Sequence, residues 1–352
     1  MGTALYAQVD VYSHHVAFSR LLPNCSKALL EFCRDLMQFD VGYDHRTQSY
    51  YKIPKRVYAS STADRSEYRF HRHQYREIIE FLARRGIFEE QFDTKVHTPC
   101  VGHPVSTFKM PDWFTPRDYQ VGIINYFVEP GYTKVTTLQT GKGKTAIALA
   151  AATQIATRTM LCVPAKYIFK WTGDALDTLG VPKDRLMVIK GSKALRTAIE
   201  LGIAGKIDCD FIIVSATTLY NYFKAYENNE LEEQGYLCPP HLLYQVLNIG
   251  LRLIDEVHEN LHLNFKQDLY GHVNKSIMLS ATLESDDPFV NKMIEIAYPF
   301  STRYKGIEYD RYIAVAALTY RANDIHKLPH KRRKMYSQVK YEESLLKWNK
   351  VA

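Results

Sequence analysis

The sequence predicts an α/β protein, in which a parallel β-sheet covered by helices is preceded by a small α+β N-terminal domain. Two observations indicate this fold class. From about residue 117 onward, short apolar runs alternate with helical segments, and this pattern is typical of a parallel sheet with helices on both faces. Ahead of that region, amphipathic helical segments flank an extended tyrosine-rich stretch, and repeated prolines mark the connection.

The N-terminal domain is expected to contain two helices and some extended chain. Apolar residues recur at helical spacing in residues 25–39 and 74–88, and residues 50–60 between them favour an extended conformation. Four prolines in residues 97–116 favour an extended connector over a helix. We therefore expect an accessory domain at 1–105, a nucleotide-binding lobe at 106–300, and a basic connector at 301–352.

The lobe is expected to contain six strands and three long helices. Each strand is a short apolar run, and the strands are expected at residues 134–139, 159–164, 184–190, 210–216, 251–256 and 275–281. The helices are expected at residues 144–156, 166–179 and 192–203. Because ligands of parallel sheets gather at the carboxyl ends of the strands, the residues that follow each strand are the candidate site residues.

Composition favours an intracellular location. No apolar stretch approaches the roughly 20 residues of a membrane helix, and the N-terminus lacks the pattern of a signal peptide. The six cysteines are scattered, which suits a reducing compartment. We expect a cytoplasmic protein, in the host cytoplasm if the source is viral. The formal net charge of +7 is compatible with binding to a phosphate backbone.

Two stretches concentrate basic residues, namely residues 65–76 and 326–334. In the first, arginines and histidines alternate with aromatic residues, which is a composition that can neutralise phosphates and stack on bases. A solvated helix face explains the same composition equally well, and both interpretations stay open for each stretch. His71 and His73 are assigned to this basic face rather than to a metal site.

The sequence "LQTGKGKT", residues 138–145, has the character of a phosphate-binding loop, because it follows a strand and opens an alanine-rich helix. Its two glycines let successive backbone N–H groups face a phosphate. Lys144 is expected to reach the β- and γ-phosphates, and Thr145 to hold Mg²⁺. Leu138 stands where the general pattern has its first glycine. The expected nucleotide-binding residues of this loop are Thr140, Gly141, Lys142, Gly143, Lys144 and Thr145.

A pair of carboxylates, Asp255 and Glu256, ends the strand "LRLI". Nucleotide hydrolysis needs one carboxylate to position Mg²⁺, expected to be Asp255, and another group to orient the attacking water, expected to be Glu256. Further along the chain, "LSAT" places the hydroxyls of Ser280 and Thr282 at another strand end, where they are candidates for coupling the nucleotide site to its surroundings. Arg252 is unusual inside a central strand.

The motifs "TGKGKT", "DEVH" and "SAT" resemble, in this order and spacing, motifs I, II and III of superfamily 2 helicases of the DExH type. The chain is similar to UvsW-type bacteriophage DNA helicases, chiefly across residues 114–285. The resemblance implies a RecA-like lobe of the P-loop NTPase class that uses ATP and Mg²⁺. It also implies an ATP-dependent DNA helicase or translocase, whose partner is nucleic acid, DNA in particular.

The resemblance assigns roles to residues beyond these motifs. "TPRDYQ" is similar to an element near the adenine, and "CVPAKYIFKW" and "IIVSATTLYNY" resemble elements that touch the nucleic-acid backbone. His258 of "DEVH" corresponds to a residue that couples the catalytic site to its surroundings. The implied residues are Arg117 and Gln120 for adenine, and Lys166, Lys170 and Thr217 for nucleic acid.

Motors of this superfamily have two RecA-like lobes. Only 70 residues follow Thr282, 352 minus 282, so we expect the chain to represent the N-terminal half. A second chain would then supply the other lobe and the arginine that stabilises the γ-phosphate. The alternative is a nucleic-acid-binding module with a vestigial nucleotide pocket.

A remote alternative is a zinc peptidase, because residues 258–262 also read His-Glu-x-x-His. That chemistry needs His258 and His262 on one helix face, with Glu259 as the base. The extended form of the pattern fails, because Phe265 and Asp268 stand where a glycine and a third histidine belong.

Overall fold

The computed structural model describes residues 5–35, 38–44, 46–55, 59–139, 141–306, 331–332 and 335–336. The chain divides into two units, Met1–Ile307 and Glu308–Ala352. The described part of the second unit is a short antiparallel pair, β14 (Lys331–Arg332) with β15 (Met335–Tyr336). Most of the basic stretch 326–334 and of the expected connector therefore lies outside the described residues.

The first unit contains the parallel sheet that the sequence predicts. Its six strands lie in the order β10-β11-β9-β12-β13-β8, and every neighbouring pair is parallel. The strand bounds are β8 Thr133–Thr137, β9 Thr159–Val163, β10 Leu186–Ile189, β11 Phe211–Ser215, β12 Leu251–Ile254 and β13 Lys275–Ser280. All six expected strands are confirmed to within a few residues, and the α/β fold class is confirmed.

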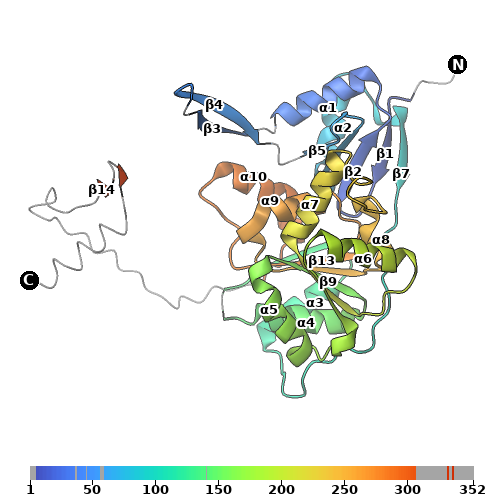
Figure 1. Cartoon of the computed structure of the whole chain (residues 1–352), viewed down its shortest axis with the longest axis vertical. Helices are drawn as coiled ribbons and strands as arrows, with labels where there is room; N and C mark the ends of the chain where they lie inside the picture. The colour runs from blue at the N-terminus through green and yellow to red at the C-terminus, as the bar shows by residue number, and fades with distance from the viewer. Residues whose placement is uncertain are drawn as a thin grey trace, which may run out of the picture. The chain divides into compact units, whose positions relative to one another are not determined.

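Helices cover both faces of this sheet (Figure 1). One face carries α3 (Asp118–Val128), α4 (Lys144–Ile155) and α5 (Ile168–Gly173), which is continued by the π-helical turn η4 (Asp174–Thr178). The other face carries α6 (Ser192–Ile203), α7 (Ala216–Glu227), α8 (Leu243–Val246), α9 (Leu261–Asp268) and α10 (Pro288–Ala297). Alternate residues of each strand enter the two cores: Leu253 faces the α3–α5 side, and Ile254 the α7–α9 side.

The N-terminal region forms a second, mixed sheet of five strands in the order β5-β6-β2-β1-β7. Its strands are β1 (Ala7–Val11), β2 (His15–Ser19), β5 (Ala59–Ser61), β6 (Glu67–His71) and β7 (Phe92–Val96), and it is covered by α1 (Pro23–Asp35) and α2 (Tyr75–Ala83). A separate hairpin pairs β3 (Gln38–Asp44) with β4 (Ser49–Lys55). The small α+β unit is therefore confirmed, whereas β1, β2, β6 and β7 were not expected from the sequence.

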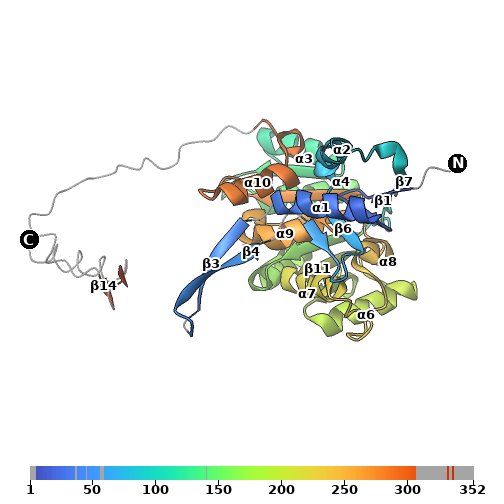
Figure 2. The same cartoon turned by 90° about the horizontal axis from the view of Figure 1, so that it is seen from above.

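The N-terminal sheet packs directly on the α7–α9 face of the lobe (Figures 1 and 2). His15 Nδ1 lies 2.9 Å from the carbonyl oxygen of Gly271, and His71 Nε2 lies 3.3 Å from Asp268 Oδ2. Arg69 is 2% exposed and bonds to His15 Nε2 at 2.6 Å. Buried polar contacts therefore join the N-terminal sheet to this face of the lobe.

This interface corrects the interpretation of the basic stretch 65–76. Arg69 and His71 are buried, so neither a solvated helix face nor a nucleic-acid surface describes them. The physical reason is strand geometry: residues 67–71 form β6, and alternate side chains of a strand point to opposite sides of the sheet.

Residues 97–116 follow an irregular extended path, as the prolines predict, but they pack closely on the lobe. A Cβ added to Gly102 would lie only 2.2 Å from the backbone nitrogen of Gly250, beside the start of β12. Val105 and Phe108 enter the α3–α5 core. The expected boundary at residue 105 stays a prediction, because packing is continuous across it.

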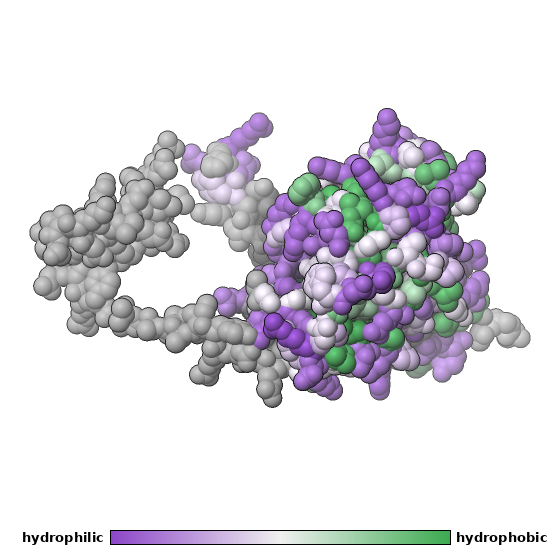
Figure 3. Space-filling model, turned by 90° about the horizontal axis from the view of Figure 1, so that it is seen from below, coloured by the Kyte–Doolittle hydropathy of each residue, from purple (hydrophilic) through white to green (hydrophobic). Residues whose placement is uncertain are grey.

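In the described part of the chain, no helix is long and apolar enough to cross a membrane. The face in Figure 3 is mostly hydrophilic, with apolar side chains in small separate patches.

Candidate nucleotide and nucleic-acid site

The phosphate loop connects β8 to the first turn of α4. Gly141 has φ +85° and Gly143 has φ +80°, both in the left-handed region that favours glycine. A Cβ on Gly143 would lie 2.7 Å from Gln120 Nε2, so the Gln120 amide would have to shift. The backbone conformation at 143 therefore favours glycine, and any side chain there would disturb Gln120. Thr140, expected in the same loop, lies outside the described residues.

The first turn of α3 holds this loop in place. Gln120 Nε2 and the Tyr119 hydroxyl both donate to the carbonyl oxygen of Lys142, at 3.2 and 3.1 Å. Gln120 Oε1 accepts from the backbone N–H of Arg117 at 2.9 Å, which caps the helix. The structure thus gives Gln120 a structural role beside the phosphate loop, while the Arg117 side chain is exposed. Contact of either residue with adenine stays a prediction.

The two carboxylates that follow β12 lie beside the first residue of α4. Lys144 Nζ donates to Glu256 Oε1 at 2.7 Å. Asp255 is 6% exposed; its Oδ2 accepts from Trp171 Nε1 at 3.1 Å, and its Oδ1 from the Glu256 backbone N–H at 3.0 Å. Burial, and then the neighbouring Glu256, raise the pKa of Asp255. The structure therefore brings the three residues with the central expected roles into one cluster.

Glu256 has an unusual backbone, with φ +49° at a residue that is not glycine. Such left-handed residues store strain and concentrate at functional sites. The strained turn starts the 3₁₀ segment η7 (Val257–Asn260), which leads into α9. The turn therefore sets the directions of the side chains that follow the acidic pair.

A hydrogen-bonded path leads from this turn to β13. The Ser280 hydroxyl donates to the carbonyl oxygen of Thr282, so its oxygen is free to accept from His258 Nδ1 at 2.9 Å. The same His258 nitrogen lies 3.4 Å from Glu256 Oε2. The hydroxyl of Ser280 therefore bonds to His258, whereas the Thr282 side chain is exposed and only its backbone takes part; coupling by either residue stays a prediction.

The zinc alternative finds no support in this geometry. His258 lies in η7 and His262 in α9, and His258 already bonds to Ser280. Among the residues that the structure describes, no group of three histidines, cysteines, aspartates or glutamates could hold a metal ion.

The residues expected to contact nucleic acid follow β9, which is the neighbour of β12 in the sheet, and β11, which lies on the other side of β9. Lys166 and Lys170 are exposed after β9, and Thr217 is exposed in the first turn of α7, directly after β11. Because these strands are parallel, their carboxyl ends meet at the same edge as the phosphate loop and the acidic pair. The tertiary structure therefore arranges all the expected site residues that it describes along one edge.

Some residues of this site were missed by sequence reasoning. Trp171 is 0% exposed and bonds to Asp255, Tyr119 bonds to the phosphate loop, and Glu259 bonds to the β9 loop. A tryptophan in a helix that follows a strand looks like core, and Trp171 does belong to the α3–α5 core; only the bond from its ring N–H to Asp255 adds a contact to the site. Tyr119 lies next to Gln120 in the element already quoted, which is the one signal that could have found it.

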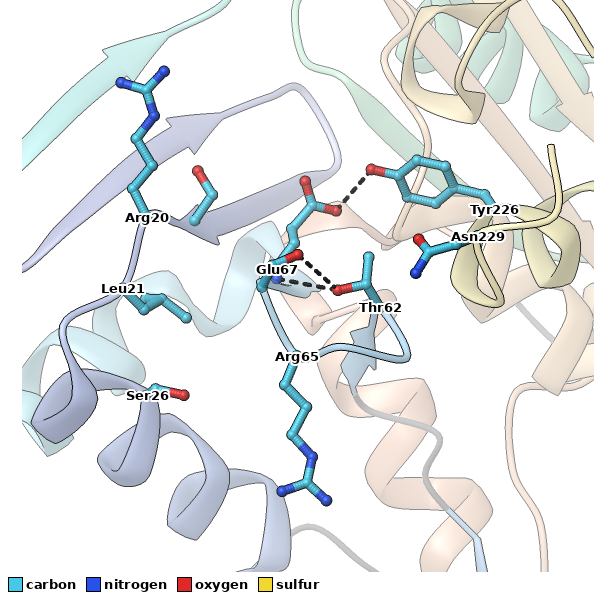
Figure 4. A pocket seen from close by; sticks show the side chains of 10 residues that line it. Arg20, Leu21, Ser26, Thr62, Arg65, Glu67, Tyr226 and Asn229 are labelled. Atoms are coloured by element: carbon cyan, nitrogen blue, oxygen red, sulfur yellow. Dashed lines mark hydrogen bonds between the residues drawn. The ribbon is translucent and has the colours of Figure 1, made fainter. Parts of the chain in front are cut away.

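A separate hollow of about 610 Å³ lies where the N-terminal sheet meets the end of α7 (Figure 4). Glu67 lines it and accepts from the Tyr226 hydroxyl at 3.2 Å. Arg20 and Arg65 also line it, but their side chains point away from each other (Figure 4). They do not converge on one ligand.

The fold is that of a RecA-like lobe. Residues 117–288 match the family model for DEAD/DEAH box helicases. No curated protein matches the sequence.

Solved structures of helicases are similar to this chain. The UvsW helicase of bacteriophage T4 is 12% identical, with a TM-score of 0.44, over 82% of this chain and 97% of that one. The Hef helicase domain of Pyrococcus furiosus is 18% identical, with a TM-score of 0.37, over 52% and 36%. A hypothetical ATP-dependent RNA helicase of Sulfolobus tokodaii is 13% identical, with a TM-score of 0.37, over 55% and 53%. The chain thus spans about a third of the Hef chain and about half of the Sulfolobus chain.

Proposed function

We propose that this protein is an ATP-driven DNA helicase or translocase, in which the described lobe binds ATP–Mg²⁺ and one strand of DNA. The observation that carries the proposal is the cluster at the sheet edge. There, Lys144 Nζ lies 2.7 Å from Glu256 Oε1, beside the buried Asp255. A structural ion pair alone would not need a glycine-built loop and two adjacent carboxylates at the end of a central strand.

The residues present fit a nucleoside triphosphate with magnesium. Gly141 and Gly143, both left-handed, carry no side chain in front of the α4 N-terminus, where backbone N–H groups favour anions. Thr145 and Asp255 offer the hydroxyl and carboxylate oxygens that Mg²⁺ prefers. When bound, the metal supplies positive charge that neutralises the phosphate oxygens.

Lys144 and Glu256 would act in sequence. In the structure the ammonium of Lys144 neutralises the carboxylate of Glu256, and a triphosphate on the loop would compete for the same ammonium. Glu256, once free of Lys144, can orient a water and take its proton. The His258–Ser280 bond holds the other side of the turn, so that the position of Glu256 depends on β13 as well.

Hydrolysis by this lobe is proposed to need a second RecA-like lobe, from a further region or from another chain. Arginines supplied across such a cleft are worth about 10³–10⁵ in rate in related NTPases. In the described part of the chain, Lys144, Asp255 and Glu256 make no hydrogen bond or ion pair with an arginine. The lobe alone is therefore expected to bind ATP better than it hydrolyses it.

The test is ATP hydrolysis by the full chain with single-stranded DNA, duplex DNA or RNA, compared with Lys144→Ala. The matched control is Lys27→Ala, an exposed lysine of α1. We expect DNA to stimulate hydrolysis, Lys144→Ala to abolish it, and Lys27→Ala to leave it unchanged. Equal hydrolysis by Lys144→Ala and the unmutated protein would refute the site. Stimulation by RNA but not by DNA would refute the choice of substrate.

A further inference from the structure

Glu259 connects the acidic turn to the loop that follows β9. Its Oε1 accepts from the Tyr167 hydroxyl at 2.6 Å, and its Oε2 accepts from Lys166 Nζ at 2.7 Å. Both carboxylate oxygens therefore bond to the same short segment, η3 (Ala165–Tyr167). The hydrogen bonds from Lys166 and Tyr167 lower the pKa of Glu259, and the bond to Glu259 raises the pKa of Lys166, so both groups are charged at neutral pH.

This ion pair lies at the surface, where it can be exchanged. The side chain of Lys166 is 61% exposed and that of Glu259 is 27% exposed. Exposed pairs of this kind contribute only about 0–1 kcal/mol, because water screens them. An incoming phosphate, which is also an anion, can therefore replace the Glu259 carboxylate on Lys166.

The surface around Lys166 suits a nucleic-acid strand. Phe169 is 90% exposed on the first turn of α5, and Lys170 beside it is exposed. Lys166 Nζ also lies 4.6 Å from the centre of the Tyr167 ring. Cations interleaved with exposed aromatic rings bind phosphates and stack on bases. Glu259 places a negative charge inside this otherwise basic surface.

The same residue is tied to the catalytic turn through its backbone. The Glu259 N–H donates to the carbonyl oxygen of Glu256 at 3.0 Å. His258, its neighbour, holds Ser280. Movement of Glu259 is therefore transmitted through the backbone to the left-handed turn that carries Glu256.

We propose that Glu259 is a positioning residue that binds Lys166 where a nucleic-acid phosphate would otherwise bind. When a nucleic-acid strand displaces Glu259 from Lys166, the movement is transmitted to the turn that carries Glu256. The inference rests on the proposed function, because it assumes that ATP hydrolysis at this turn responds to nucleic acid. It names the physical link between the loops that follow β9 and β12, which are neighbouring strands of the sheet.

Glu259→Gln tests the link, because glutamine keeps the size and can still accept from Tyr167 but loses the charge. We expect single-stranded DNA to bind about two- to fivefold more tightly, as the competing pair is weak. ATP hydrolysis without DNA should rise by a similar factor, and the stimulation by DNA should shrink accordingly. The matched control is Glu295→Gln, an exposed glutamate of α10, which should change none of these quantities.

Lys166→Ala separates the link from a merely structural contact. It frees Glu259 as well, so hydrolysis without DNA should rise, but DNA affinity should fall. The slope of log affinity against log salt should decrease by roughly 0.7, the value of one lost phosphate contact on a single strand. A structural role for the pair would instead give both variants the same loss of thermal stability, with unchanged stimulation.

The outcomes distinguish this inference from the proposed function. If the unmutated protein hydrolyses ATP with DNA stimulation, and Glu259→Gln leaves affinity and unstimulated rate unchanged, the link is wrong and the proposed function stands. If the unmutated protein neither binds single-stranded DNA nor hydrolyses ATP, the proposed function falls, and the link falls with it.

Discussion

Asp268→Asn removes the charge that balances Arg252 inside the first unit. The Arg252 side chain is 0% exposed and that of Asp268 is 1% exposed; Arg252 Nη2 donates to Asp268 Oδ1. Arg252 Nε also donates to Ser276 Oγ at 2.9 Å, and Asp268 Oδ2 lies 3.3 Å from His71 Nε2. Burial by itself would raise the pKa of Asp268, but Arg252 and the His71 hydrogen bond lower it well below its usual range. The pair is therefore ionised at neutral pH.

The size of the effect follows from burial. An exposed ion pair contributes about 0–1 kcal/mol, whereas removing one partner of a buried pair costs about 3–5 kcal/mol, because the remaining charge has lost its hydration. Asparagine can still accept one hydrogen bond from Arg252, so we expect a loss near the lower end, about 3 kcal/mol. The double variant Arg252→Met, Asp268→Leu removes both charges, and it should be more stable than Asp268→Asn.

The assay is urea unfolding followed by circular dichroism, which gives the free energy of unfolding for each variant. The control is Asp208→Asn, which breaks an ion pair with Arg185 in which Asp208 is 84% exposed, and it should lose less than about 1 kcal/mol. Equal small losses of unfolding free energy for Asp268→Asn and Asp208→Asn would show that Arg252 does not become an unbalanced buried charge when Asp268 is replaced. The reasoning would then be wrong.

Three further predictions concern the site and the interface. Gly143→Ala places a Cβ where φ is +80° and the nearest atom is 2.7 Å away. The resulting backbone strain, about 1–3 kcal/mol, is enough to lower ATP affinity at least about tenfold. Unchanged binding in a titration with fluorescent ATP would contradict this expectation. Trp171→Phe removes the N–H that stabilises ionised Asp255, so we expect the pKa of that carboxyl to rise further and ATP hydrolysis to need a higher Mg²⁺ concentration. An unaltered dependence of hydrolysis on Mg²⁺ concentration would show that the Trp171–Asp255 hydrogen bond does not have this role. Burial is the main reason why the pKa of His241 is lowered to about 3 and that of His272 to about 4. The unfolded chain then takes up protons below pH 6.5 that the folded chain does not, so stability should fall as the pH drops from about 6.5 to about 4; equal unfolding free energies at pH 7 and pH 5 would contradict this.

The lobe could be predicted from sequence because its pattern is strong. Buried parallel strands are short apolar runs, and α4 and α6 between them are 12 residues each with a helical pattern of apolar residues. The helix expected at residues 192–203 has the same bounds in the structure. The N-terminal strands gave no such signal, because β1 and β2 mix histidine and polar residues with apolar ones. Their buried histidines are satisfied by the lobe, which no local pattern reveals.

By itself, the sequence determined the six strands of the lobe in their order along the chain, three of its helices, and the identity of the phosphate loop and the acidic pair. Those features are local, since a glycine-rich turn and a strand-terminal carboxylate need only a few neighbouring residues. Only the tertiary structure decided which distant side chains meet, such as Lys166 with Glu259, or Arg252 with Asp268 and His71. Such contacts depend on which strands are neighbours and on which face of the sheet the N-terminal strands cover, and both are set by packing of the whole unit.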